Sequence, residues 1–259
     1  MNYWTQSNSN IFVAAHRGWS ARFAENTMEA FRAAAELGVD QIETDVRLTK
    51  DGELVLFHDE TLERVTDGSG RVADHTLKEL KKLSVKGAGR IPTLCEFLEL
   101  FRAYPRLTLD MELKEYPTEG REALAYDTCD RVLRLISEAG LDDRCVINTF
   151  SGRLHEYIRS TYGQKYKQHV YYPQRHLGDC ALDPYSYAYC TCVFGVQEGS
   201  VTIEEVRSLN RKTGVRIWAG AYVKDEPTAD LAVRMGAELI TCNNPDEILA
   251  ILRDKKLHR

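Results

Sequence analysis

Residues 25–48 read ENTMEAFRAAAELGVDQIETDVRL and contain the two alternating elements from which the fold can be predicted. Apolar residues recur with helical spacing over 26–37, Asn26 or Thr27 is a suitable N-cap, and Gly38 stands just past the end. Residues 41–48 read as a strand, and residues 11–15, ahead of the helix, read as another. A strand, a helix and a second strand in this order predict a parallel β-α-β unit.

The same alternation continues outward from this unit to the end of the chain. Further strands are expected at 54–57, 107–113, 145–148, 169–172, 190–194, 215–219 and 238–241, and helices at 93–101, 119–139, 152–161, 202–212, 228–235 and 245–253. About eight such units predict a single α/β domain over residues 1–259, a (β/α)8 TIM barrel. An open doubly wound sheet is the competing fold, but the Gly-rich loop that often follows its first strand is absent from the sequence.

One polar segment interrupts the alternation. Residues 59–92 are rich in glycine and charge and contain one short predicted helix at 76–83. We expect this segment to be a small insertion after the second strand region, either covering the site or making a subunit contact.

Charge and composition exclude several classes of partner. The chain has 34 Lys and Arg against 39 Asp and Glu, a formal net charge of -5, which offers no long-range attraction to nucleic acid or an anionic bilayer. No long apolar segment is present, and residues 1–10 lack the basic and apolar regions of a secretory signal. The 7 cysteines are odd in number and scattered, which indicates reduced, mostly buried thiols. A cytoplasmic protein without stable membrane association is expected.

Three carboxylates are predicted to share one rim of the barrel. Glu43 and Asp45 are two positions apart in a predicted strand, so their side chains leave the same face. Glu112 lies on the strand that begins at residue 107. Like charges placed together in this way favour a bound cation, and hard oxygen ligands select Ca²⁺, Mg²⁺ or Mn²⁺. Bridging by arginines is the alternative.

Histidines and cations are expected on the same rim. His16 and Arg17 follow the first predicted strand, His58 follows the strand at 54–57, and Lys114 shares a strand face with Glu112. Histidine titrates near neutrality and suits general acid and base roles, while Arg17 and Lys114 would add positive charge around a phosphate. A divalent ion, two cations and two histidines are the components needed to cleave a phosphodiester. Residues 25–27 read as a helix cap only.

These residues, taken in order, resemble the glycerophosphodiester phosphodiesterase family. The phrases that carry the resemblance are AHRG (15–18), ENTMEAF (25–31), GVDQIETDVRLTKDGELVLFHDETLERVTDGSG (38–70), RIPTLCEFL (90–98) and MELK (111–114). The second half matches more loosely, through residues 148–150, Trp218 and the run 236–245.

The resemblance implies a TIM barrel that hydrolyses glycerophosphodiesters to sn-glycerol 3-phosphate and an alcohol. It implies His16 and His58 as the acid/base pair, without assigning which is the acid. It implies Glu43, Asp45 and Glu112 as ligands of a divalent metal ion, Ca²⁺ or Mg²⁺. Substrate contacts are expected from Arg17, Lys114 and Trp218, with burial in the core as the alternative for Trp218.

Two departures from the family pattern lie in the second half. Family members usually continue Thr-Val-Asn after the tryptophan, where this chain has Ala219-Gly220-Ala221. They usually read Thr-Asp-x-Pro near the end, where this chain has Thr241-Cys242-Asn243-Asn244-Pro245. Neither departure removes a proposed ligand or acid/base residue, so we expect them to affect the choice of substrate.

Three other functions remain as alternatives. The altered second half is compatible with a non-catalytic barrel that binds a phosphorylated metabolite. A phospholipase-type phosphodiesterase with a different diester substrate uses the same architecture, although this sequence offers no apolar or basic membrane-binding loop. A metal-dependent lyase or isomerase is the third, because fold alone does not determine chemistry.

Overall fold

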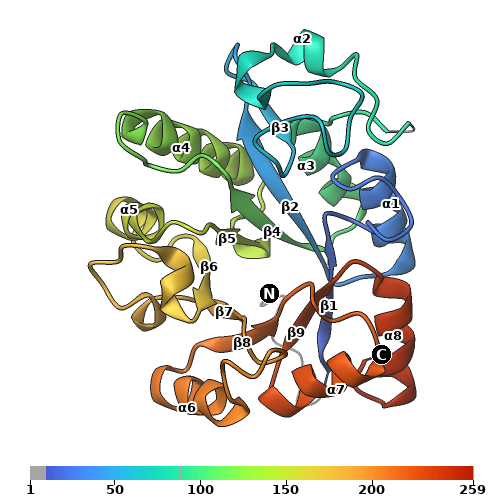
Figure 1. Ribbon diagram of the computed structural model, residues 1–259, viewed down its shortest axis with the longest axis vertical. Helices are drawn as coiled ribbons and strands as arrows, with labels where there is room; N and C mark the ends of the chain where they lie inside the picture. Colours follow the sequence, from blue (N-terminus) through green and yellow to red (C-terminus); the bar gives the residue numbers. More distant parts are fainter. Residues whose placement is uncertain (1–9, 88, 259) are drawn as a thin grey trace.

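The computed structural model describes residues 10–87 and 89–258, so most of the polar start from which the absence of a signal was inferred lies outside the described residues. Eight parallel strands form a closed barrel in the order β1-β9-β8-β7-β6-β5-β4-β2, and pairing of β1 with β2 closes it. The helices lie around the outside of the ring (Figure 1). The TIM-barrel prediction is confirmed.

The elements follow the predicted alternation closely. The strands are β1 (Phe12–His16), β2 (Gln41–Leu48), β3 (Leu54–Leu56), β4 (Thr108–Leu113), β5 (Cys145–Asn148), β6 (Lys167–Tyr172), β7 (Cys190–Val193), β8 (Arg216–Ala219) and β9 (Leu239–Cys242). The α-helices are α1 (Met28–Leu37), α2 (Leu77–Leu80), α3 (Leu94–Ala103), α4 (Glu122–Glu138), α5 (Gly152–Tyr162), α6 (Ile203–Thr213), α7 (Glu226–Met235) and α8 (Pro245–Asp254).

Local sequence explains how α1 is bounded. The Thr27 side chain accepts a hydrogen bond from the backbone N–H of Ala30, and Gly38 adopts the left-handed conformation with φ 88° just past the last turn. The buried face of α1 includes Phe31, whose ring lies 4.5 Å from that of Phe97 on α3. The helix therefore packs with α3 in the apolar layer outside the barrel.

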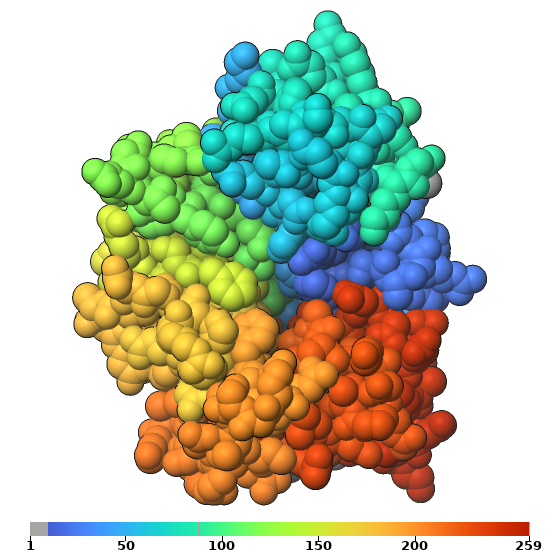
Figure 2. All heavy atoms as spheres, in the orientation of Figure 1, coloured from blue at the N-terminus to red at the C-terminus, as the bar shows by residue number. Residues whose placement is uncertain are grey.

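The strand β3 does not belong to the barrel. It pairs antiparallel with the end of β2, and the chain then continues into the inserted segment. That segment contains α2 and the short 3-10 helix η1 (Val72–Asp74) and has its own small apolar core around Val55, Leu62 and Leu80. It forms a lobe at one side of the barrel, coloured cyan in Figures 1 and 2. Because β2 ends beneath it, this lobe lies next to the carboxyl ends of the strands.

The cysteines behave as predicted. All seven thiols are free and five of them are buried, with Cys95 exposed and Cys180 intermediate. Of the helices within residues 10–87 and 89–258, none combines the length and the apolar character of a transmembrane segment.

Candidate active site

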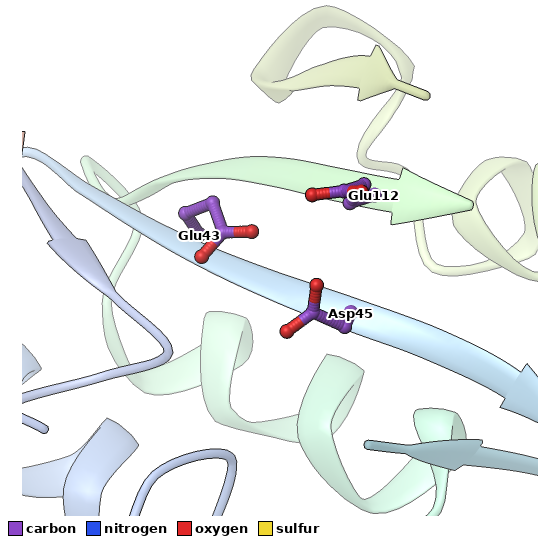
Figure 3. A group of neighbouring side chains, drawn as sticks. All are labelled: Glu43, Asp45 and Glu112. Carbon is purple, nitrogen blue, oxygen red and sulfur yellow. The ribbon is translucent and has the colours of Figure 1, made fainter. Parts of the chain in front are cut away.

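The three predicted carboxylates converge between two neighbouring strands. In the parallel pairing of β2 with β4, Glu43 lies beside Asp110 and Asp45 lies beside Glu112. Glu43, Asp45 and Glu112 are all buried, and one oxygen of each lies within 4.8 Å of the others. Figure 3 shows their carboxylates pointing toward one common space. As predicted, Glu43 and Asp45, two positions apart on β2, leave the same face of the strand.

The charges in this group are only partly compensated by protein. Burial raises the pKa of Glu43 well above its ordinary value, and the negative charges of Asp45 and Glu112 raise it further. Burial also raises the pKa of Glu112 to about 7, although Lys114 opposes that shift. Asp45 differs, because Lys114 and Arg17 outweigh its burial and lower its pKa. Glu43 and Glu112 therefore resist ionisation when no cation is bound. Three buried carboxylate oxygens of this kind fit a hard divalent cation.

Two cations flank the carboxylates as predicted. Lys114 Nζ lies 3.0 Å from Asp45 Oδ1 and also bonds the Glu112 carboxylate. Arg17 Nε lies 3.4 Å from Asp45 Oδ2, while the Arg17 backbone N–H donates to Glu43 Oε2 over 3.1 Å. Arginine thus contacts Asp45 through its side chain and Glu43 through its backbone. The charge of Arg17 lowers the pKa of Glu43, but burial and the charges of Asp45 and Glu112 outweigh this effect and keep the pKa raised.

His16 is the last residue of β1 and pairs in register with Glu43. Its Nε2 lies 3.8 Å from Glu43 Oε2, and its Nδ1 lies 2.7 Å from Asn243 Oδ1, just beyond β9. Since an amide oxygen only accepts, Nδ1 carries the proton and Nε2 is left as a base facing the carboxylates. Burial, with the nearby Arg17 charge, lowers the pKa of His16 to about 4 and keeps the ring neutral.

His58 reaches the same rim from the start of the insertion. Its Nδ1 bonds Asp59 Oδ1 at 2.6 Å, and Arg64 holds Asp59 through its Nε and Nη2 atoms. Arg64 also donates to both carboxylate oxygens of Glu25, which in turn accepts from Arg17. A chain of charged side chains therefore connects the inserted lobe to the barrel and fixes the His58 ring.

The interpretation of residues 25–27 as a helix cap alone is wrong for Glu25, which bonds Arg17 and Arg64, and for Asn26. Thr27 does cap α1, but Asn26 Nδ2 donates to Asp45 Oδ2 over 2.8 Å, and Asn26 Oδ1 accepts from Thr44 Oγ1 over 2.8 Å. Asn26 is buried and its φ is 54°, a left-handed conformation that asparagine tolerates better than most residues. Sequence reasoning also missed Asp59, Arg64 and the role of Asn243. The local signals were the HD dipeptide at 58–59 for Asp59 and the altered run at 241–245 for Asn243.

Trp218 differs from the other predicted site residues in its apolar surroundings. It is 1% exposed and packs inside the barrel among residues such as Phe12, Val146 and Leu239. Its ring meets that of His169 edge to face, with centroids 4.9 Å apart, and His169 bonds Asp110. This placement agrees with the core alternative, and a substrate contact from Trp218 stays a prediction.

Comparison with known proteins identifies relatives of this chain. A family model described as "Glycerophosphoryl diester phosphodiesterase family" matches residues 16–247. A glycerophosphodiester phosphodiesterase of Caldanaerobacter subterraneus subsp. tengcongensis is 44% identical over 150 residues, which are 54% of this chain and 58% of that protein. The aligned part thus spans little more than half of the relative's length.

Solved structures share the fold over nearly the whole chain. A protein from Silicibacter pomeroyi superposes with a TM-score of 0.84 at 21% identity, over 98% of this chain and 97% of that one. A phosphodiesterase from Oleispira antarctica, in complex with the product sn-glycerol-3-phosphate, superposes with a TM-score of 0.75 at 23% identity, over 93% and 96% of the two chains. At these identities the similarity is one of fold.

Proposed function

Since the chain belongs to the glycerophosphoryl diester phosphodiesterase family, we propose that it hydrolyses glycerophosphodiesters to sn-glycerol 3-phosphate and an alcohol. The observation that carries the proposal is the convergence of His16, His58 and the three carboxylates on one rim. The relative that is 44% identical is named for this activity, and the fold neighbour from Oleispira antarctica holds sn-glycerol-3-phosphate as product.

Glu43, Asp45 and Glu112 would hold a divalent metal ion, Ca²⁺ or Mg²⁺. When bound, such an ion supplies positive charge that stabilises the phosphate oxygens of the diester as charge develops on them. The protein residues around it contribute binding and orientation. Arg17 and Lys114 are held against the carboxylates and present further positive charge to the phosphate.

His16 and His58 would move the protons. One takes a proton from the attacking hydroxyl, and the other gives a proton to the leaving alkoxide. His16 is oriented by Asn243 and His58 by Asp59, so each ring presents one defined nitrogen. We propose that the protein acts in the cytoplasm on deacylated, water-soluble diesters.

The test measures sn-glycerol 3-phosphate release from glycerophosphoethanolamine and glycerophosphocholine, with Ca²⁺, Mg²⁺ or Mn²⁺ and with EDTA. Wild type is compared with His16→Ala and His58→Ala, and with His75→Ala as a matched histidine control on the surface of the insertion. The proposal expects release that EDTA abolishes and that falls at least about 100-fold in His16→Ala and His58→Ala but not in His75→Ala.

Two results would reject the proposal. Absence of release with every metal, from these two diesters and also from diesters with an anionic alcohol, would favour the non-catalytic barrel or a diester of another kind. Release that survives in both histidine variants would place the chemistry on other residues. Hydrolysis of intact lipid vesicles at a comparable rate would instead indicate a phospholipase-type enzyme.

A further inference from the structure

A cavity of about 400 Å³ lies beside the carboxylate cluster, between the inserted lobe and the loop that follows β4. Lys114 forms its inner end, and that same side chain bonds Asp45 and Glu112. Arg47 forms the wall next to His58, because its Nε donates to the His58 carbonyl oxygen over 2.9 Å. The cavity therefore opens directly beside the position proposed for the phosphate.

The strands explain why this cavity is basic. Arg47 is two residues beyond Asp45 on β2, so it leaves the same face one step closer to the rim. Arg71 comes from the insertion, just before η1, and Arg121 comes from the start of α4. Three guanidinium groups from three separate elements thus line one cavity.

Two carboxylates compensate these charges in part. Glu115 lies 4.0 Å from Arg47 Nη1 and accepts from Arg121 Nη2 over 2.8 Å. Glu60 pairs with Arg71. Three guanidinium groups against two carboxylates leave one net positive charge in this lining, whereas the charge of Lys114 at the inner end is paired with Asp45 and Glu112. Burial raises the pKa of Tyr116 to about 12, so its hydroxyl also stays available as a donor in this wall.

A glycerol group would make poor use of this lining. Glycerol is uncharged, so its hydroxyl groups could accept hydrogen bonds from the arginines but could not neutralise their positive charge. A quaternary ammonium group suits an aromatic cage, but Tyr116 is the one aromatic residue among the described residues that line the cavity. The guanidinium groups would also repel it. An anionic group on the alcohol, in contrast, would find donors in planar, bidentate geometry.

We propose that this cavity binds the alcohol part of the diester and selects alcohols that bear a carboxylate or phosphate group. The inference rests on the proposed hydrolysis of glycerophosphodiesters. Arg71 and Arg121 act as specificity-determining residues, because 54% and 40% of their side-chain surfaces are exposed and their remaining N–H groups can reach a ligand.

The test compares kcat/KM within two pairs of substrates. Glycerophosphoserine differs from glycerophosphoethanolamine by one carboxylate, and glycerophosphoinositol 4-phosphate differs from glycerophosphoinositol by one phosphate. Wild type is expected to prefer the anionic member of at least one pair by about tenfold, the effect of one charge-assisted hydrogen bond. The pair that shows the preference identifies the anionic group. Arg71→Gln and Arg121→Gln should each reduce that preference several-fold.

A matched control removes a positive charge elsewhere. Arg102 on α3 pairs with Glu99 at 3.0 Å, is 79% exposed and does not line the cavity, so Arg102→Gln should leave the preference unchanged. Wild type that treats both members of each pair alike, or a preference that survives in both cavity variants, would overturn the inference. Failure to cleave all four diesters would instead reject the proposed function itself.

Discussion

Asn243 Oδ1 lies 2.7 Å from His16 Nδ1, so a residue just beyond the last strand orients a residue that ends the first. The two are 227 positions apart and meet because β1 pairs in parallel with β9. This relationship gives a function to one of the departures from the family pattern. The loop after β9 carries the partner of a proposed acid/base residue as well as part of the rim.

Replacing Asn243 by alanine should lower kcat by about tenfold or more, because the His16 ring loses the hydrogen bond that fixes its tautomer and orientation. Asn243→Asp keeps an acceptor oxygen at the same place and should restore much of the loss. Ser20→Ala is the matched control. Ser20 Oγ donates to the same Asn243 oxygen over 3.1 Å but does not bond His16. Equal rates in Asn243→Ala and Ser20→Ala would contradict the assignment.

Local pattern was sufficient to predict β2 and the convergence of its carboxylates. The strand has the bounds that its sequence indicates, and residues two apart on a strand must share a face. The antiparallel pairing of β3 was not predicted, because an apolar run of this length reads the same in a barrel strand and in a hairpin.

Removing one carboxylate from the cluster should have opposite effects on stability with and without metal. Glu43→Gln removes a carboxyl group whose ionisation is opposed by burial and then by the charges of Asp45 and Glu112, so the variant should melt higher than wild type in EDTA. Excess Ca²⁺ or Mg²⁺ should raise the melting temperature of wild type more than that of Glu43→Gln, because wild type keeps all three carboxylate ligands. Each kcal/mol corresponds to about 2–4 °C in a chain of this size. Thermal unfolding in the two conditions tests this, and an unchanged order would argue against a metal at these residues.

A buried histidine outside the site should make stability depend on pH. His155 on α5 is fully buried, and its ring nitrogens lie 2.8 Å from Gln168 Oε1 and 3.1 Å from the Thr149 carbonyl oxygen. Burial lowers the pKa of His155 to about 4, although the hydrogen bonds with Gln168 and Thr149 oppose this shift. Between that value and the ordinary pKa of ~6.5, the unfolded chain binds a proton that the folded chain does not. Stability contributed by neutral His155 is therefore present above the ordinary pKa and lost as pH falls toward 4.

Urea unfolding at pH 7 and pH 5 measures this contribution. Wild type should lose about 2 kcal/mol more than His155→Gln over this interval, whatever the absolute stability of the variant. Comparing the change from pH 7 to pH 5 in the two proteins cancels the contributions of the other titratable groups. Identical losses in the two proteins would show that His155 does not carry the effect.

The interpretation of residues 25–27 failed for a physical reason. A helix cap needs one side chain, and Thr27 supplies it, so nothing in the local pattern directs Asn26 elsewhere. The partner of Asn26 is Asp45, 19 positions away, and the pair forms only once α1 packs on the barrel. Contacts of this kind arise from tertiary packing, as does the burial of Trp218 inside the ring.

The glycine that follows His16 and Arg17 should be intolerant of any side chain. Gly18 has φ 78°, and a Cβ there would lie 2.7 Å from the backbone carbon of Ala30 and 2.9 Å from its oxygen. Backbone cannot move aside cheaply, so Gly18→Ala should destabilise the fold by about 2–4 kcal/mol, combining the left-handed conformation with the clash. Gly38→Ala separates the two effects, because Gly38 has φ 88° with nothing within 4 Å of its Cβ position. Its cost should be about 1 kcal/mol, from the left-handed conformation alone. Denaturant unfolding of both variants gives the difference, and equal costs would show that the approach of α1 to Gly18 is looser than these distances indicate.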